Sequence, residues 1–539
     1  MKRKSLYLLF LFLFVPALLI ACSGGKSEET SNGGTNESEN NETTAPQEEG
    51  ATSGGTLKIA YEAQPNTLDP TVTTAGATKD LSRPIYESLV TLNENWEITP
   101  QLAESFEIND DGTVVTFKLR QGVLFHNGEE MTAEDVVASM KKWSEYSSLA
   151  KTMFSGAEWV AVDDYTVELH LERPSYLVMH ALADQNQIAA IMPKEIAEAA
   201  DATGAKEYIG TGPFKFAEWQ TDQYVKMVKF EDYKPLSENA SGLAGEKLAL
   251  VDEIYWYFVP DESTRIAGLI SGEYDIATGV SYDAVDQVEA VPHLSAYVHP
   301  YGFQMLVFNK QEGLFTDVKA RQAVNYAVDK NAILQTSFAD ERFYRLESSL
   351  FRPEQTEWYS EVGKEIYETN DLDLAKQLLA EAGYNGEEIV ILTSRDYAYQ
   401  YNAAVSVQQM LNDVGINAKL DVYDWGTLLE RRSDPGAWDI FFTGWDTSLI
   451  PHQYSFLDSE AEWPGWTNSP EIDQILEDME TAATPEELKA LNDKLHEEFW
   501  NYLPLVNIGN YSKITGINEK VKGYYDFIGP VVWNVSVEE

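Results

Sequence analysis

The sequence predicts an α/β protein built from two or three domains. Segments in which apolar and polar residues alternate with period two, typical of strands, are interleaved with amphipathic segments that end at glycine, typical of helices. This interleaving is the pattern of mixed α/β lobes. The residues from 54 onwards are also too many for a single hydrophobic core, which favours more than one domain.

Individual strands and helices follow from these patterns. Strands are predicted from the alternation in "GGTLKIAYEA", "GTVVTFKLR" and "YTVELHLERP". Helices are predicted in "DLDLAKQLLAEAGY" and "YNAAVSVQQMLNDVGI", ending at Gly383 and Gly415, and the strand "INAKLDVYD" follows the second helix. Residues 484–487, "TPEE", form a capping box with proline in the first turn, and they predict a helix that runs towards Trp500.

Cys22, the only cysteine of the chain, lies where an apolar segment meets a polar one. Basic residues precede an apolar run from Leu6 to Ala21, which is shorter than the roughly 20 residues of a membrane-spanning helix. This order is that of a secretory signal. The sequence Leu19-Ile20-Ala21-Cys22 resembles the bacterial lipobox, in which signal peptidase cuts before the cysteine and a lipid is attached to its sulfur. We therefore expect a signal peptide at residues 1–21 and a lipid on Cys22, against the alternative of an ordinary signal with a chance cysteine.

The polar segment after Cys22 and the overall charge limit the possible partners. Residues 22–53 are rich in Ser, Asn, Gly, Thr and Glu and contain no aromatic residue, which predicts a disordered tether. The chain has 88 acidic and 39 basic residues, a net charge of −49. No basic patch that could neutralise phosphates is visible, so nucleic acid is not expected as a partner.

The sequence contains no recognisable catalytic constellation. It lacks a nucleophile elbow, a phosphate-binding loop and a dinucleotide fingerprint. None of its seven histidines forms a pair with metal-ligand spacing. Acidic residues are so abundant that any carboxylate pair proposed for glycoside hydrolysis would be arbitrary. We expect no cofactor and no metal, and a cell-surface hydrolase is the weakest of the alternatives.

Six stretches occur in a fixed order along the chain. They are "GGTLKIAYEAQPNTLDP", "LAESFEINDDGTVVTFKLRQGVLFHNGEEMTAEDVVASMKKW", "IGTGPFKFAEW", "DESTRIAGLISGEYDIA", "LVFNKQEGLFTDVKARQAVNYAVDKNAIL" and "DLAKQLLAEAGY". In this order they resemble the extracellular solute-binding proteins of the oligopeptide, dipeptide and nickel ABC importer family. Gram-positive members of that family use a lipobox in place of a periplasm.

The resemblance implies a two-lobed, periplasmic-binding-protein-like fold of class II that encloses its ligand by hinge closure, with an extra subdomain in the first lobe. It places lobe I at residues 54–98, 208–302 and 502–539, the extra subdomain at 99–207, and lobe II at 303–501. It also implies a binding protein rather than an enzyme. We expect a monomer, anchored by Cys22 at the extracellular face of the cell membrane, that delivers short peptides to ABC permease subunits driven by cytoplasmic ATPases.

The resemblance also suggests ligand contacts. Peptide-binding relatives hold the ammonium of the peptide with a carboxylate and its carboxylate with an arginine. Arg395, in "IVILTSRDYAYQYNAAVSVQQML", stands at the position of the arginine. Asp446, directly after Gly444-Trp445, is the candidate carboxylate, although in peptide binders this residue stands nearer the position of Ser448. The candidate walls of the cleft are Trp445, Tyr397 and Tyr399.

A second hypothesis keeps the fold and changes the solute to a nickel chelate, haem, glutathione or an oligosaccharide. The departure at Asp446, the neighbouring His452 and the tryptophan-rich loop "EAEWPGW" support it. Sugars stack well on tryptophan faces, and the clustered aromatic residues of this region suit a ligand cleft as well as a core.

Overall fold

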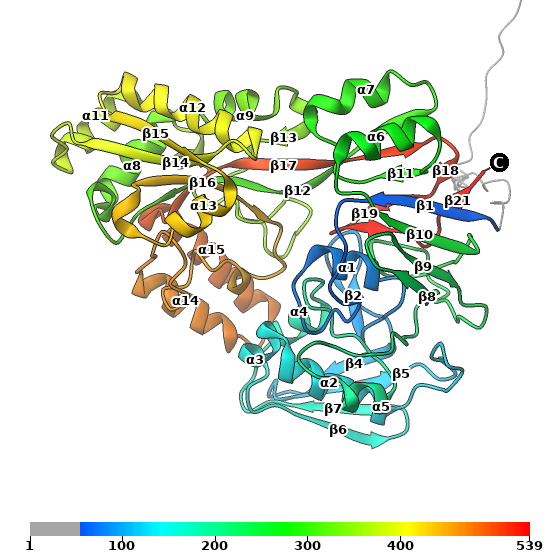
Figure 1. Ribbon diagram of the computed structural model, residues 1–539. Helices are drawn as coiled ribbons and strands as arrows, with labels where there is room; N and C mark the ends of the chain where they lie inside the picture. The colour runs from blue at the N-terminus through cyan, green and yellow to red at the C-terminus, as the bar shows by residue number, and fades with distance from the viewer. Residues whose placement is uncertain (1–53, 539) are drawn as a thin grey trace, which may run out of the picture. The chain divides into compact units, whose positions relative to one another are not determined.

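The computed structural model describes residues 54–538 of the chain (Figure 1). The predicted signal peptide, Cys22 and the predicted tether lie in residues 1–53, outside the described residues. Among the described residues, no helix is both long enough and apolar enough to cross a membrane.

One large sheet of 11 strands runs through the described residues. Ten of its strands follow one another in the order β15 (Asn417–Tyr423), β14 (Glu388–Ser394), β16 (Ile440–Asp446), β12 (Leu294–Phe308), β17 (Leu505–Asn518), β11 (Ile276–Ala277), β1 (Thr56–Tyr61), β10 (Glu253–Phe258), β9 (Tyr224–Lys229) and β8 (Phe214–Gln220). The remaining strand, β13 (Tyr344–Arg345), pairs with β17.

The long strands β12 and β17 join the two halves of this sheet (Figure 1). They pair with each other from Leu294 to Val307 of β12. The second half of β12, from Gly302 onwards, also pairs with β16. The short strand β11 pairs with Gly516 and Ile517, near the C-terminal end of β17. We call β1 and β8–β11 the sheet of lobe I, and β14–β16 the sheet of lobe II. The predicted two-lobed α/β fold is thereby confirmed.

The helices around this sheet fall into two groups according to their position in the chain. Those before β12 that pack near lobe I are α1 (Gly76–Ser82), α6 (Glu262–Ser271) and α7 (Val285–Glu289). Those between β12 and β17 in the chain are α8 (Val318–Ala327), α9 (Lys330–Phe338), α10 (Lys364–Glu368), α11 (Leu372–Glu381), α12 (Ala398–Asp413), α13 (Trp425–Arg431), α14 (Pro470–Glu480) and α15 (Pro485–Tyr502).

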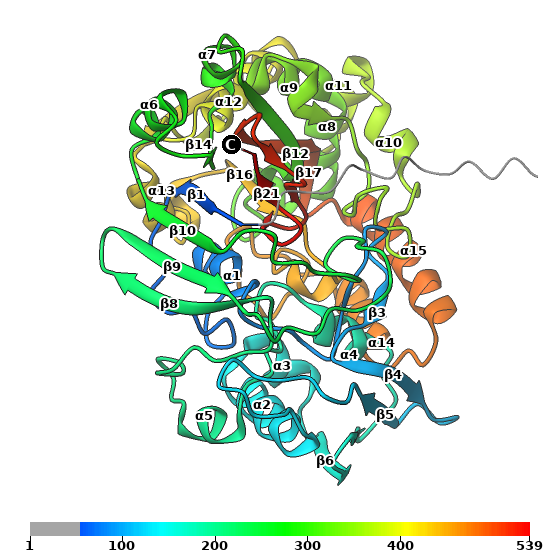
Figure 2. The same cartoon turned by 90° about the vertical axis from the view of Figure 1, so that its right-hand side faces the viewer.

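A separate four-stranded antiparallel sheet has the order β4 (Ala103–Ile108), β5 (Val114–Leu119), β7 (Thr166–His170) and β6 (Glu158–Asp163). It lies with α2 (Ala133–Tyr146) and α5 (Lys194–Ala199) away from the large sheet in both views (Figure 2). Two further helices of this region are α3 (Ser148–Met153) and α4 (Leu177–Ala183). This is the extra subdomain of the fold, and its limits at 99 and 207 stay a prediction.

Three strand pairs complete the described structure. They are β2 (Val90–Leu92) with β3 (Ile98–Pro100), β18 (Val521–Lys522) with β21 (Ser536–Val537), and β19 (Tyr525–Asp526) with β20 (Pro530–Val531). The hairpin of β2 and β3 spans the predicted boundary between residues 98 and 99.

The local sequence signals match these elements. The alternating segments form β1, β5, β7 and β15, and the two glycine-terminated segments form α11 and α12. Gly383 and Gly415 adopt φ of +80° and +96°, the left-handed conformation that ends a helix most easily at glycine. The predicted cap of α15 differs in one respect. The Thr484 hydroxyl accepts from the Glu487 N–H as expected, but the Glu487 carboxylate accepts from the N–H of Ala483 instead of Thr484.

Fully buried tryptophans mark the hydrophobic core in each region. Trp143 lies on α2 of the subdomain, Trp256 on β10 of lobe I, and Trp500 on α15. Each buried side chain of this size contributes on the order of 2–3 kcal/mol or more of hydrophobic free energy. The apolar positions of these strands and helices are therefore used for packing.

Candidate ligand-binding cleft

Two neighbouring cavities lie where the lobes and the subdomain meet. We call the first the hinge cavity, because the strands β12 and β17 that join the lobes line it together with α1 and residues 526–530; it has a volume of about 250 Å³. We call the second the subdomain cavity; α3, residues 184–187 and residues 444–455 line its volume of about 630 Å³. Thr74, Asn186 and Asp446 line both cavities, so the two form one continuous cleft.

Asp446, the carboxylate predicted to bind the ligand, lies at the junction of the two cavities. It is the last residue of β16, is exposed, and pairs across the sheet with Gly302 of β12. The hydroxyl of Tyr301 donates a hydrogen bond of 2.5 Å to its Oδ2. Burial raises the pKa of Tyr301, and the negative charge of Asp446 raises it further. Tyr301 therefore remains a neutral donor that orients the carboxylate.

The other predicted contacts occupy different places. Trp445 lines the subdomain cavity and packs against Trp463, with ring centroids 5.6 Å apart. Arg395, by contrast, is exposed at the end of β14; its guanidinium stacks on the ring of Tyr401 at 5.0 Å and donates to that hydroxyl at 3.3 Å. Tyr397 is also exposed, and Tyr399 packs between Phe338 and Tyr511. Of the five ligand contacts predicted from the sequence, Asp446 and Trp445 line these cavities.

Three further carboxylates of the hinge cavity already have donors inside the protein. Tyr61 donates to Asp80 at 2.6 Å, Thr278 donates to Glu62, and the N–H of Gly529 donates to Asp526 at 2.9 Å. Their acceptor capacity is therefore partly used before any ligand arrives.

Two lysines also line the hinge cavity. Lys79 Nζ forms an ion pair with Asp80 Oδ1 at 3.9 Å, which is beyond hydrogen-bond distance. Lys513 Nζ lies 3.5 Å from the centroid of the Tyr301 ring. No local sequence pattern marks these lysines or Tyr301, because the three residues come from distant segments of the chain.

The comparisons with known proteins identify the family. Residues 97–464 match the family described as "Bacterial extracellular solute-binding proteins, family 5 Middle". The chain belongs to this family. A protein of Sinorhizobium fredii named "Probable peptide ABC transporter periplasmic-binding protein" is 31% identical over 506 residues, which cover 89% of this chain and 93% of the relative. The predicted family resemblance is thus confirmed.

Two solved structures extend the similarity to the fold of this family 5 protein. The periplasmic binding protein AgaA of A. tumefaciens R10, in complex with agropinic acid, is 28% identical with a TM-score of 0.70, covering 90% of this chain and 99% of AgaA. The periplasmic binding protein DppA of Helicobacter pylori, in complex with the peptide STSA, is 27% identical with a TM-score of 0.71 and the same coverage. The family consists of solute-binding proteins and not of enzymes, as predicted.

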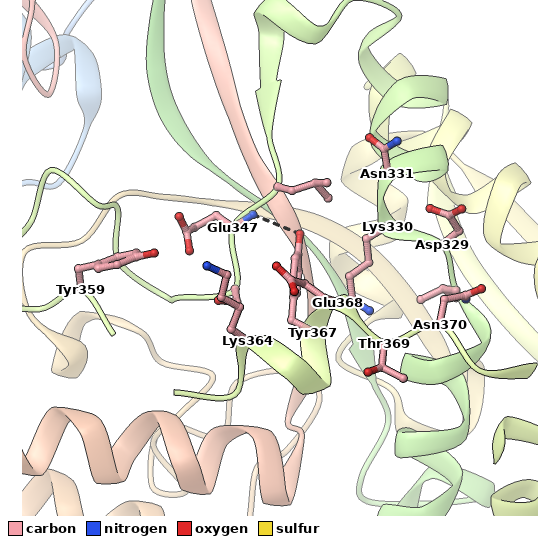
Figure 3. Close-up of a pocket in the computed structure, with 13 residues that line it drawn as sticks. Asp329, Lys330, Asn331, Glu347, Tyr359, Lys364, Tyr367, Glu368, Thr369 and Asn370 are labelled. Carbon is pink, nitrogen blue, oxygen red and sulfur yellow. Dashed lines mark hydrogen bonds between the residues drawn. The ribbon is translucent and has the colours of Figure 1, made fainter. Parts of the chain in front are cut away.

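A third cavity of the family 5 protein, of about 230 Å³, lies between α9, α10 and residues 346–359 (Figure 3). It shares no lining residue with the hinge and subdomain cavities. Lys330 Nζ donates to the carbonyl of Asn325 at 3.2 Å, and burial lowers the pKa of Lys330 to about 7. The N–H of Glu347 donates to the Tyr367 hydroxyl at 3.2 Å. The first bond joins α9 to α8 and the second joins the loop to α10, so we assign the cavity to the packing of lobe II.

Of the features that favoured a non-peptide solute, the tryptophans of "EAEWPGW" lie outside the lining of both cavities of this family 5 protein. Trp463 and Trp466 are half-buried against the core, where Trp466 stacks on the buried Trp438 at 5.6 Å. His452 lines the subdomain cavity, but its Nε2 is 3.0 Å from the carbonyl of Leu476, and burial lowers its pKa. Among the described residues, no group of three or more His, Cys, Asp or Glu side chains could hold a metal ion.

Proposed function

We propose that this family 5 protein is the substrate-binding component of an ABC importer that captures short peptides between its lobes and delivers them to a membrane permease. The position of the Asp446 carboxylate, where the two cavities meet, is the observation that supports the proposal most. This carboxylate is exposed to both cavities, and Tyr301 occupies only one of its acceptor sites. The names of the Sinorhizobium relative and of the peptide-bound Helicobacter structure agree with a peptide as the solute.

In this proposal Asp446 accepts hydrogen bonds from the ammonium group of the peptide, and Trp445 forms a wall for its side chains. The hinge and subdomain cavities together offer a volume within the roughly 300–1,000 Å³ of typical ligand sites. Arg395 remains the contact that the family resemblance suggests for the carboxylate, and Tyr397 and Tyr399 remain the suggested walls beside it. In the present structure these three residues lie outside the lining of both cavities.

Calorimetry with a pool of di- to hexapeptides tests the role of Asp446. We expect Asp446→Asn to weaken the binding of peptides with a free ammonium group about tenfold, equivalent to about 1.4 kcal/mol. Binding of N-acetylated peptides, which lack the charge, should be unchanged by the substitution. Asp413→Asn, at the exposed end of α12, is the matched control and should leave both affinities as they are.

Two results would contradict this assignment. If wild type binds acetylated and free peptides equally, the ammonium makes no contact with Asp446. If mass spectrometry of the solute retained through purification finds glutathione, a nickel chelate, haem or an oligosaccharide instead of peptides, the second hypothesis for the solute is correct.

We further propose that the protein is anchored through a lipid on Cys22 and acts as a monomer on the extracellular face of the cell membrane. Its partners would be two permease subunits and their cytoplasmic ATPases. The lipobox-like residues before Cys22 support the anchor. Because a lipidated cysteine with more than one acyl chain holds a protein stably at a bilayer, Cys22→Ala should move the protein from the membrane fraction to the medium. Retention of the variant in the membrane fraction would rule out anchoring through this cysteine.

A further inference from the structure

The helix α4 of the subdomain is held against lobe II at both of its ends. All of its residues, Leu177–Ala183, are buried, and both views place it beside α14 of lobe II (Figure 1 and Figure 2). Just before the helix, the N–H of Tyr176 donates to the carbonyl of Ala482, between α14 and α15, at 2.8 Å. Just after it, Asp184 Oδ1 accepts from the side-chain amide of Gln453 at 2.8 Å. The helix therefore spans an interface between the subdomain and lobe II.

The middle of α4 contacts lobe II through His180. The side chain of His180 is fully buried, and its Nε2 donates to Oε2 of Glu357, in the loop before α10, at 2.9 Å. Its ring meets the ring of Trp358 edge to face, with centroids 5.2 Å apart. At the rim of the same interface, Arg173 donates to Glu480 of α14 at 2.7 Å. The contact with lobe II thus extends from one end of α4 to the other.

This interface is more polar than a permanent core. His180 Nδ1, Glu357 Oε1 and Trp358 Nε1 are buried and have no hydrogen-bond partner among the described residues. A buried polar atom without a partner costs free energy, which is recovered when water reaches that atom. Permanent cores contain few such atoms, whereas interfaces between domains that move are more polar. The contact between α4 and lobe II therefore resembles one that forms and separates.

The connections of the subdomain explain why the contact would separate. The buried ion pair between Lys142 of α2 and Asp69 ties the subdomain to lobe I, and β12 and β17 join lobe I to lobe II. When lobe II rotates about these two strands to open the cleft, Glu357 and Gln453 move away from α4. Asp184 and Gln453 also line the subdomain cavity, so the hydrogen bond between them closes part of its wall.

We propose that α4 is a latch, whose contacts with lobe II form when the cleft closes and break when it opens. The inference extends the proposed function, because it gives the subdomain a role in closure. His180 and Glu357 line neither cavity of the cleft, so they contribute to closure and not to recognition of the solute. Every solute that is bound by closure gains affinity from the latch without touching it.

Glu357→Ala tests this role by calorimetry with the pool of di- to hexapeptides. The variant removes the acceptor of His180, and we expect it to weaken binding about threefold to tenfold. The factor should be the same for free and N-acetylated peptides, in contrast to Asp446→Asn. Glu381→Ala is the matched control, because it removes an ion pair of the same length, 2.9 Å, between Glu381 and Lys319 within lobe II. Unchanged affinity in Glu357→Ala, or a loss for one class of peptides only, would overturn the latch.

A covalent bridge across the interface tests whether α4 must leave lobe II before a peptide enters. Arg173→Cys and Glu480→Cys, made together with Cys22→Ala, place the only two thiols of the chain at its rim, where the original side chains are 58% and 26% exposed. We expect a short bismaleimide to join them and to slow peptide association about tenfold or more, since the cleft can no longer open. Equal association rates with and without the bridge would show that α4 stays on lobe II throughout, and the inference would be wrong.

The bridging yield of the ligand-free protein separates this inference from the choice of solute. We expect Glu357→Ala to lower the yield and Glu381→Ala to leave it unchanged. If the yield falls in Glu357→Ala but no peptide binds to the wild type, the latch stands and the proposed solute is wrong. If Glu357→Ala lowers the unfolding temperature but keeps the bridging yield and the peptide affinity of the wild type, the contact serves the stability of the fold and the latch is refuted.

Discussion

Replacing either partner of the Asp69–Lys142 ion pair should lower the free energy of unfolding by about 3–5 kcal/mol, as expected when a buried charge loses its partner. Lys142 Nζ lies 2.7 Å from Asp69 Oδ2 and 2.9 Å from Oδ1, and both side chains are almost fully buried. Burial lowers the pKa of Lys142, whereas the charge of Asp69 raises it. Asp69→Asn leaves the ammonium without a counter-charge, and Lys142→Met leaves the carboxylate without one.

Asp69 also organises the loop between β1 and α1. Its Oδ1 accepts from the N–H of Thr71 at 3.1 Å, and its Oδ2 accepts from the N–H of Ala205 at 2.7 Å. Thr74, three residues beyond Thr71, lines both cavities of the cleft. The ion pair thus ties α2 of the subdomain to a loop that lines the proposed ligand cleft, and we expect the single variants to weaken peptide binding as well.

Denaturant unfolding of the two single variants and the double variant measures this coupling. The double variant should lose less stability than the sum of the single variants, because it removes both charges together. The exposed pair Lys194–Glu134, at 2.9 Å, also links α5 to α2 and is the matched control; Lys194→Met should cost no more than about 1 kcal/mol. A cost below 1 kcal/mol for Asp69→Asn and Lys142→Met would show that burial does not strengthen the pair.

The contrast between Lys142 and its neighbours shows what the sequence could predict. The segment "EDVVASMKKW" belongs to a stretch that resembles the family, and its spacing is helical. The pattern cannot tell which lysine of the pair 141–142 is buried, because the answer depends on Asp69, which reaches α2 only through the tertiary fold. Strands and helices with periodic patterns could be predicted, because the alternation of apolar and polar residues that marks them involves only residues close together in the sequence.

The proposed ligand site divides in the same way. Asp446 could be named from the sequence because it directly follows a strand ending in Gly-Trp, although the family resemblance places the carboxylate nearer Ser448. Lys79, Tyr301 and Lys513 could not be named, because α1, β12 and β17 are distant in the sequence and only the tertiary fold brings them to one cavity. Within it, His299 of β12 pairs with Lys513 of β17. Arg395 matched the family position in sequence, yet it lies on the surface against Tyr401. Whether it contacts a solute stays a prediction.

Gly302→Ala should damage the fold and the proposed site together, because the backbone of β16 leaves no room for a side chain at this position. Gly302 is buried in β12 and pairs with Asp446 of β16, next to an irregularity in the pairing with β17. A Cβ at this position would lie 2.1 Å from the carbonyl oxygen of Trp445 and 3.2 Å from the Cα of Asp446. Since backbone atoms cannot rotate away as a side chain can, β16 must shift, and the Asp446 carboxylate shifts with it.

We therefore expect Gly302→Ala to lower the free energy of unfolding by about 3 kcal/mol, at the upper end of overpacking effects, and to weaken peptide binding at least tenfold. Denaturant unfolding and calorimetry on the same preparation measure the two losses. Gly436→Ala is the matched control, because its nearest non-neighbouring atom, Asp434 Oδ1, would lie at an ordinary 3.4 Å from the added Cβ. Wild-type stability and affinity in Gly302→Ala would mean that β12 and β16 can separate freely, and that Asp446 does not depend on their close contact for its position in the cleft.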